Sequence, residues 1–110
     1  MIAAARPSHR QQVRGVDAHC HVFDVARFAY AADAAYRPPP HEAGTTEQFV
    51  AVLDAHGLSH AVLVNPSSGY GYDNRCMLAA ISAHPGRLAG IARVRPDVDH
   101  RTLAELRDGG

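Results

Sequence analysis

Three short, mostly apolar runs alternate with helical patterns along this chain, and that alternation restricts its fold more than any other feature. The runs lie at residues 14–19, 60–65 and 88–94, and each has the length of a buried strand. A helical pattern follows every run. A strand–helix order repeated three times predicts the α/β class, with a parallel sheet, right-handed crossovers and helices covering the sheet.

Local signals mark where the first two predicted helices begin. Thr45 and Gln48 have the spacing of a capping box, which opens the first predicted helix. Asp73 or Asn74 is predicted to cap the second helix, because both residue types accept hydrogen bonds from free backbone N–H groups. The third predicted helix spans residues 101–107.

A long connection separates the first run from the first helix. It spans residues 24–45 and contains Tyr36 and three consecutive prolines at residues 38–40. Proline has no backbone donor and disfavours regular helix, so this segment is predicted to be a loop. Long loops inside compact domains often carry part of a binding site, whereas a floppy insertion is the alternative.

Length and charge limit the classes of function. The 110 residues suffice for one small domain, predicted at residues 15–110 after a flexible leader at 1–14. Eleven basic side chains balance eleven acidic ones, so we expect no nucleic-acid partner and no attraction to an anionic membrane. No apolar stretch approaches the ~20 residues of a membrane span. The first fifteen residues lack the apolar core of an export signal, which predicts a cytoplasmic protein with reduced Cys20 and Cys76.

Two histidines stand two residues apart at the end of the first run. In a strand, residues i and i+2 share a face, so His19 and His21 are predicted to present their rings side by side. Neighbouring imidazoles suit one divalent metal or one polarised carbonyl. A strand end that carries two polar residues explains the same spacing. Asp17 is predicted to share the histidines' face, either orienting His19 or accepting a hydrogen bond behind it.

Several segments of the chain together resemble a known family. The segment VDAHCHVFD at residues 16–24 resembles the first-strand motif of the amidohydrolase superfamily. The branch similar to 2-pyrone-4,6-dicarboxylate hydrolase matches more narrowly, at residues 36–38, 60–67, 71–74 and 87–94. The family's fold is a (β/α)₈ TIM barrel of about 250 residues. The resemblance therefore implies an amino-terminal segment with the first three βα units of an incomplete barrel.

The resemblance also implies a site and a reaction. His19 and His21 would be the catalytic residues at the reacting carbonyl of a lactone or related carboxylate, which water attacks. Tyr36 and Ser67 would hydrogen-bond the substrate carboxylate or ring oxygen, although loop packing and turn formation are alternative roles for them. In metal-dependent relatives the two histidines are ligands of zinc or manganese. The lactone branch implies no metal.

The resemblance also implies functional groups on later strands of the barrel. These are another histidine, the arginines that bind carboxylates and an aspartate that activates water. We therefore expect this chain alone to have no appreciable hydrolase activity.

Side chains on the inner face of three strands would also be uncovered, which predicts self-association or a complementing fragment. These side chains are Val16, Val62, Val64, Ile91 and Val94. The alternatives are a non-catalytic α/β remnant that self-associates, a metal-dependent decarboxylase fragment and a small metal-binding protein.

Overall fold

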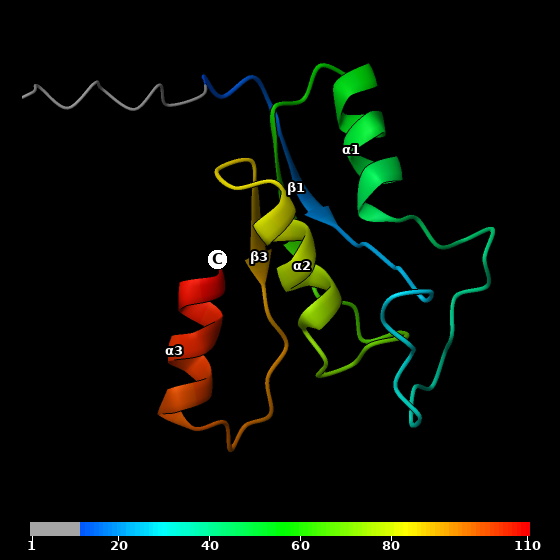
Figure 1. The fold of residues 1–110 in the computed structure, drawn as a ribbon, viewed down its shortest axis with the longest axis vertical. Coiled ribbons are helices and arrows are strands. Elements are labelled where there is room, and N and C mark those ends of the chain that lie inside the picture. Colours follow the sequence, from blue (N-terminus) through cyan, green and yellow to red (C-terminus); the bar gives the residue numbers. More distant parts are fainter. Residues whose placement is uncertain (1–11) are drawn as a thin grey trace, which may run out of the picture.

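Strands and helices alternate along the chain in the predicted order. The structure, a computed structural model, describes residues 12–110, so most of the predicted leader at 1–14 lies outside the described residues. The elements are β1 (Val16–Cys20), α1 (Thr46–Ala55), β2 (His60–Val64), α2 (Arg75–Ala83), β3 (Leu88–Ile91) and α3 (His100–Gly109) (Figure 1). The prediction of three βα units is confirmed.

One sheet with the strand order β1-β2-β3 organises the described residues, and both strand pairs are parallel. The parallel direction brings the carboxyl ends of all three strands to the same edge. The segments that follow the strands leave the sheet at this edge, at the bottom of the view in Figure 1. In (β/α) barrels this edge is the one that carries the chemistry.

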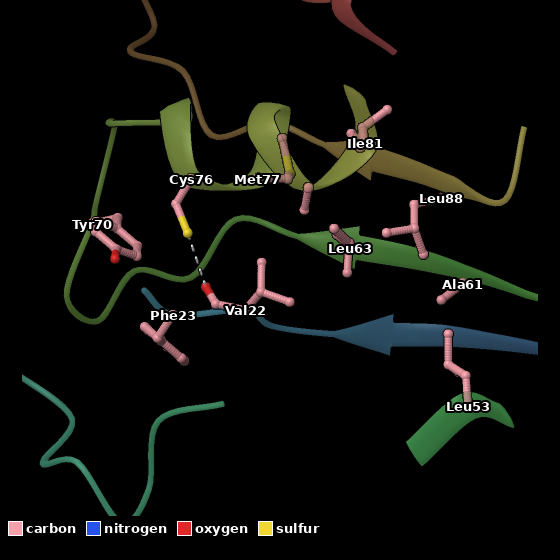
Figure 2. Close-up of a cluster of buried hydrophobic side chains, with 11 residues drawn as sticks. Val22, Phe23, Leu53, Ala61, Leu63, Tyr70, Cys76, Met77, Ile81 and Leu88 are labelled. Atoms are coloured by element: carbon pink, nitrogen blue, oxygen red, sulfur yellow. Dashed lines mark hydrogen bonds between the residues drawn. The ribbon is translucent and has the colours of Figure 1, made fainter. Parts of the chain in front are cut away.

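Core side chains gather between the sheet and its helices. Figure 2 shows Met77 and Ile81 of α2 above Leu63 of β2, with Leu53 of α1 reaching toward Ala61. The full buried cluster consists of Val22, Phe23, Leu53, Ala61, Leu63, Tyr70, Cys76, Met77, Ala80, Ile81 and Leu88. Removing such side chains from water is the main favourable contribution to folding.

The opposite face of the sheet is open to solvent among residues 12–110. Ile91 pairs with Val64 in the β2–β3 register, and its side chain is 56% exposed, while Val16 at the start of β1 is 46% exposed. Paired residues in neighbouring strands share a face, so these side chains belong to the face that the core does not use. In a closed barrel this is the inner face.

The third strand ends earlier than its apolar run predicts, at Ile91 rather than residue 94. Beyond Ile91, the side-chain amide of Asn74 binds the backbone of Arg93. Its Oδ1 accepts from the Arg93 N–H at 2.9 Å, and its Nδ2 donates to the Arg93 carbonyl at 3.0 Å. The predicted capping role of the Asn74 side chain is therefore wrong. Asp73 instead accepts from the Arg75 N–H at 3.1 Å.

The long connection between β1 and α1 is ordered by one buried tyrosine. The Tyr70 hydroxyl donates to the Phe28 carbonyl at 2.9 Å and accepts from the Asp24 N–H at 3.0 Å. Its ring stacks on Phe23 with centroids 5.9 Å apart. Burial is the main cause that raises the pKa of Tyr70, so the hydroxyl keeps its proton and its donor role. The loop is thus attached to the core, which argues against a floppy insertion.

Candidate functional site

The two predicted histidines lie at the carboxyl end of β1 with their rings together. His19 is in the strand and His21 follows it. Their ring centroids are 5.3 Å apart and the ring planes meet at 82°. Both residues are exposed to solvent. The predicted placement of the rings side by side is confirmed.

A hydrogen bond to the neighbouring strand sets the tautomer of His21. Its Nδ1 lies 2.7 Å from the carbonyl oxygen of Val64, the last residue of β2. A carbonyl oxygen only accepts, so Nδ1 must carry the hydrogen. In the neutral ring, Nε2 is therefore left with a free lone pair, available to a metal ion, a water molecule or a proton.

Asp17 does not share the face of His21, contrary to the prediction. The register shifts between Asp17 and Cys20, which pair with Ala61 and Leu63, and both of those partners are buried in the core. This β-bulge interrupts the strict alternation that the prediction assumed. The carboxylate of Asp17 accepts from the backbone N–H of His19 at 3.2 Å, so it supports the main chain at the motif.

Tyr36 and Ser67 come together at a pocket of 550 Å³. Tyr36 belongs to the connection after β1 and Ser67 to the loop after β2, so the pocket lies between two of the loops at the carboxyl edge. Tyr70 and Tyr72 also line it. The histidine pair does not line this pocket. The structure thus groups the predicted site residues as two pairs.

Backbone hydrogen bonds join the two loops beside Tyr36. The Gly69 N–H donates to the Tyr36 carbonyl, and the Gly69 carbonyl accepts from the Ala31 N–H, both at 2.8 Å. Gly69 has a φ of +67°, and a Cβ at this position would lie 2.9 Å from the Tyr30 ring. Glycine satisfies both requirements because it lacks a side chain.

The hydroxyl of Tyr36 already has a partner in the structure. It donates to the carboxylate of Glu42, and this hydrogen bond is the largest cause of a raised pKa for Tyr36. A hydroxyl has one hydrogen to donate. Tyr36 must therefore turn away from Glu42 before it can donate to a substrate oxygen.

Two arginines at the same pocket were not predicted as site residues. Arg93 and Arg95 follow β3, and the Cζ atom of each lies 4.5 Å from the centroid of the Tyr72 ring. Both line the pocket that contains Tyr36 and Ser67. The family resemblance implies carboxylate-binding arginines only on later strands. An Arg-x-Arg spacing directly after a strand was the available signal, by the same i, i+2 rule as the histidines.

The two cysteines are not candidates for nucleophilic chemistry. Burial, and secondarily the charge of Asp17, raises the pKa of the Cys20 thiol to about 12. Burial also raises the pKa of Cys76, whose Sγ points to the Val22 carbonyl oxygen 3.9 Å away (Figure 2). A thiol is a nucleophile only as the thiolate, which these environments disfavour near neutral pH.

His19 and His21 would supply two nitrogen ligands to a metal, fewer than a complete site needs. Catalytic zinc sites use three protein ligands. Residues 12–110 contain no group of three or more His, Cys, Asp or Glu side chains placed to hold one ion. The described residues therefore offer at most part of a metal site.

No helix in this part of the chain has the length and apolar character needed to cross a bilayer.

Comparison with known proteins matches this chain to amidohydrolases. A family model described as amidohydrolase matches residues 16–109. The 2-pyrone-4,6-dicarboxylate hydrolase of Comamonas testosteroni is 31% identical over 107 residues, which cover 96% of this chain and 34% of that protein. The 4-sulfomuconolactone hydrolase of Hydrogenophaga intermedia is 32% identical over 95 residues, covering 86% of this chain and 30% of that protein.

Solved structures give the same match. A protein of Acinetobacter baumannii described as a 2-pyrone-4,6-dicarboxylic acid hydrolase, with citric acid bound, superposes with a TM-score of 0.76 at 36% identity. The match covers 87% of this chain and 34% of that one. A Pseudomonas putida protein described in the same way gives 0.75 at 36% identity, with 90% and 35% covered. This chain spans about a third of the length of these relatives.

Proposed function

The chain belongs to the amidohydrolase family, and from that premise we propose that its three βα units form part of a barrel enzyme that hydrolyses a carboxylated lactone. The matched relatives named as hydrolases of a pyrone dicarboxylate and of a muconolactone support this substrate class. The citric acid bound to the Acinetobacter baumannii relative is itself a tricarboxylate. In the proposed reaction, water attacks the lactone carbonyl and the ring C–O bond breaks, which leaves a carboxylate and a hydroxyl group.

The observation that carries the proposal is the histidine pair at the carboxyl edge of the sheet. The Val64 carbonyl accepts a hydrogen bond from the Nδ1–H of His21, so the neutral ring presents Nε2 as a hydrogen-bond acceptor. We assign His21 to orient the attacking water and His19 to polarise the lactone carbonyl through a ring N–H. Such positioned groups commonly contribute ~10²–10⁴-fold to a rate.

Tyr36 and Ser67 are assigned to hydrogen-bond substrate oxygens. Their position on one pocket beside the carboxyl edge supports this role. If zinc or manganese takes part, His19 and His21 supply two of its ligands and the others come from outside the described residues. A Lewis acid at that place would polarise the carbonyl or lower the pKa of bound water. A cytoplasmic location stays a prediction.

A chimera tests the proposed function. Residues 16–109 of this chain replace the matching third of the Comamonas testosteroni enzyme, and hydrolysis of 2-pyrone-4,6-dicarboxylate is followed by the loss of pyrone absorbance. We expect turnover, with His19→Asn and His21→Asn each lowering kcat/KM by about 100-fold or more. His56→Asn, at the exposed end of α1, is the matched control. A chimera that melts cooperatively but has no turnover contradicts the proposal, as does full activity of His19→Asn.

A further inference from the structure

Two arginines and a tyrosine form a cationic stack beside the site. Arg93 and Arg95 lie two residues apart after β3, each with its Cζ 4.5 Å from the Tyr72 ring centroid. We call these three residues the arginine–tyrosine stack. An arginine that lies on an aromatic ring uses the face of its guanidinium and leaves the N–H groups at the edge free. Those N–H groups match the two oxygens of a carboxylate.

Neither guanidinium of the stack is neutralised within residues 12–110. The ion pairs of this part of the chain engage Arg27, Arg75, Arg87, Arg101 and Arg107. Arg75 binds Asp73, which lines the same pocket as Arg93 and Arg95, at 2.9 Å. Two adjacent positive charges without a carboxylate partner attract an anion from solution.

Two asparagine side chains hold the backbone at Tyr72 and Arg93. Asn74 binds the backbone N–H and carbonyl of Arg93, as described above. Asn65, at the end of β2, donates through Nδ2 to the carbonyls of Gly71 and Asp73 at 2.9 and 3.2 Å, one residue on either side of Tyr72. The backbone segments that carry Tyr72 and Arg93 are therefore fixed before a ligand arrives, which lowers the entropic cost of binding.

Two hollows share the stack as a common wall. The 550 Å³ pocket contains Tyr36 and Ser67, and a second pocket of 320 Å³ lies on the side of α3. The second pocket contains the carboxylates of Asp97 and Asp99, which repel an anion. In the first pocket Asp73 is already bound by Arg75, so Asp33 is the one lining carboxylate without an ion pair in the described residues. The charge balance favours anion binding in the first pocket.

We propose that the arginine–tyrosine stack binds a carboxylate group of the substrate in the 550 Å³ pocket, with the Ser67 hydroxyl as a neighbouring donor. This inference rests on the proposed function, because that function identifies the anion as a substrate. It adds recognition residues within this chain to the arginines that were expected only on later strands.

Citrate is the probe for this site, because it carries three carboxylates. The chain is labelled with ¹⁵N, and the Nε–Hε signals of its arginines are followed by NMR during titration at constant ionic strength. We expect saturable shifts of Arg93 and Arg95, with the Arg101 signal unchanged. The trimethyl ester of citrate, which has no charge, should cause no shift.

Substitutions then measure the contribution of each guanidinium. Arg93→Gln and Arg95→Gln are each expected to weaken citrate binding by about tenfold, the usual effect of losing one charge-assisted contact. Arg101→Gln removes the same charge from an exposed position on α3 and should leave the affinity unchanged. Arg93→Lys keeps the positive charge but loses the paired N–H donors of the guanidinium, so it should also bind citrate weakly. This variant tests the site if Arg93→Gln does not fold.

The outcomes separate this inference from the proposed function. Equal shifts of Arg93 and Arg101, or wild-type citrate affinity in the folded Arg93→Gln and Arg95→Gln variants, overturn the stack as a binding site. In the active chimera, Arg93→Gln should raise KM about tenfold while kcat changes little. An unchanged KM there, with His19→Asn still inactive, overturns this inference alone. Citrate binding to the stack in a chimera without turnover overturns only the proposed function.

Discussion

The Nδ1 atom of His21 lies 2.7 Å from the carbonyl oxygen of Val64, so a residue that follows β1 is oriented by the last residue of β2. This contact defines the chemistry of the His21 ring, because it keeps the hydrogen on Nδ1 and leaves Nε2 as the free nitrogen. It also ties the position of the His21 ring to correct pairing of the two strands. A shift in the register of β2 would move the acceptor and release the ring.

We predict that neutral His21 is the Nδ1–H tautomer. The Val64 carbonyl requires a donor at Nδ1, whereas an unconstrained imidazole in water favours hydrogen at Nε2. Long-range ¹H–¹⁵N correlation spectra above pH 8 should show Nδ1 with the shift of a protonated nitrogen and Nε2 with that of a bare one. The exposed His56 is the internal reference. An Nε2–H tautomer at His21 would mean that the contact is absent in solution.

Gly69→Ala is predicted to destabilise the chain by about 1–3 kcal/mol, because it combines a positive φ with a Cβ only 2.9 Å from the Tyr30 ring. Gly57→Ala is the matched control. Its φ of +68° is nearly the same, but a Cβ there meets no atom within 4 Å, so the cost should be only about 1 kcal/mol. Urea denaturation of both variants measures the difference. Equal losses of stability in the two variants would mean that the close approach of Tyr30 to Gly69 adds no cost.

The stability of α3 is predicted to fall in acid because of Asp99. This residue caps the helix by accepting from the Thr102 N–H at 2.7 Å, and that hydrogen bond lowers the pKa of the carboxyl group. A lowered pKa in the folded state adds stability above the unfolded value of about 3.9, and this is lost as the pH falls through the folded value.

Asp99→Asn separates the charge from the cap. Asparagine still accepts the N-terminal hydrogen bond but does not titrate in this range. Thermal melts at pH 6 and pH 2.5, followed by far-UV circular dichroism, should show a smaller acid-induced drop in Tm for Asp99→Asn than for the wild type. Asp99→Ala should be less stable at both pH values. The same acid-induced drop in wild type and Asp99→Asn would place the titrating group elsewhere.

Self-association through the open sheet face is predicted from its exposed side chains. Ile91 and Val16 lie on this face and are 56% and 46% exposed, and apolar surface of this kind favours burial against another molecule. Sedimentation velocity of the wild type should show a coefficient that rises with concentration, and Ile91→Lys should reduce the rise. Leu103→Lys tests an exposed leucine of α3 and should leave it unchanged. A wild type that sediments as a monomer at all concentrations contradicts the prediction.

Patterns between near neighbours in the sequence predicted much of this fold. The capping box of Thr45 and Gln48 is present, with Thr45 accepting from the Gln48 N–H. The alternation of strands and helices predicted the parallel sheet, and the i, i+2 spacing predicted the adjacent rings of His19 and His21. The capping box and the histidine pair each span at most four residues, where backbone geometry alone decides which side chains meet. The parallel sheet follows from the order of strands and helices along the chain.

The sequence by itself determined the βα order, the capping box of the first helix and the paired imidazoles, because each depends on local backbone geometry. Tertiary structure alone decided that a bulge turns Asp17 from the face of His21, and that Asn74 binds Arg93 nineteen residues away rather than capping its helix. It also brought the Tyr72 ring into contact with both Arg93 and Arg95. Such contacts depend on how the strands pair and how the loops pack, because they join residues that are far apart in the sequence. No residue spacing along the chain predicts them.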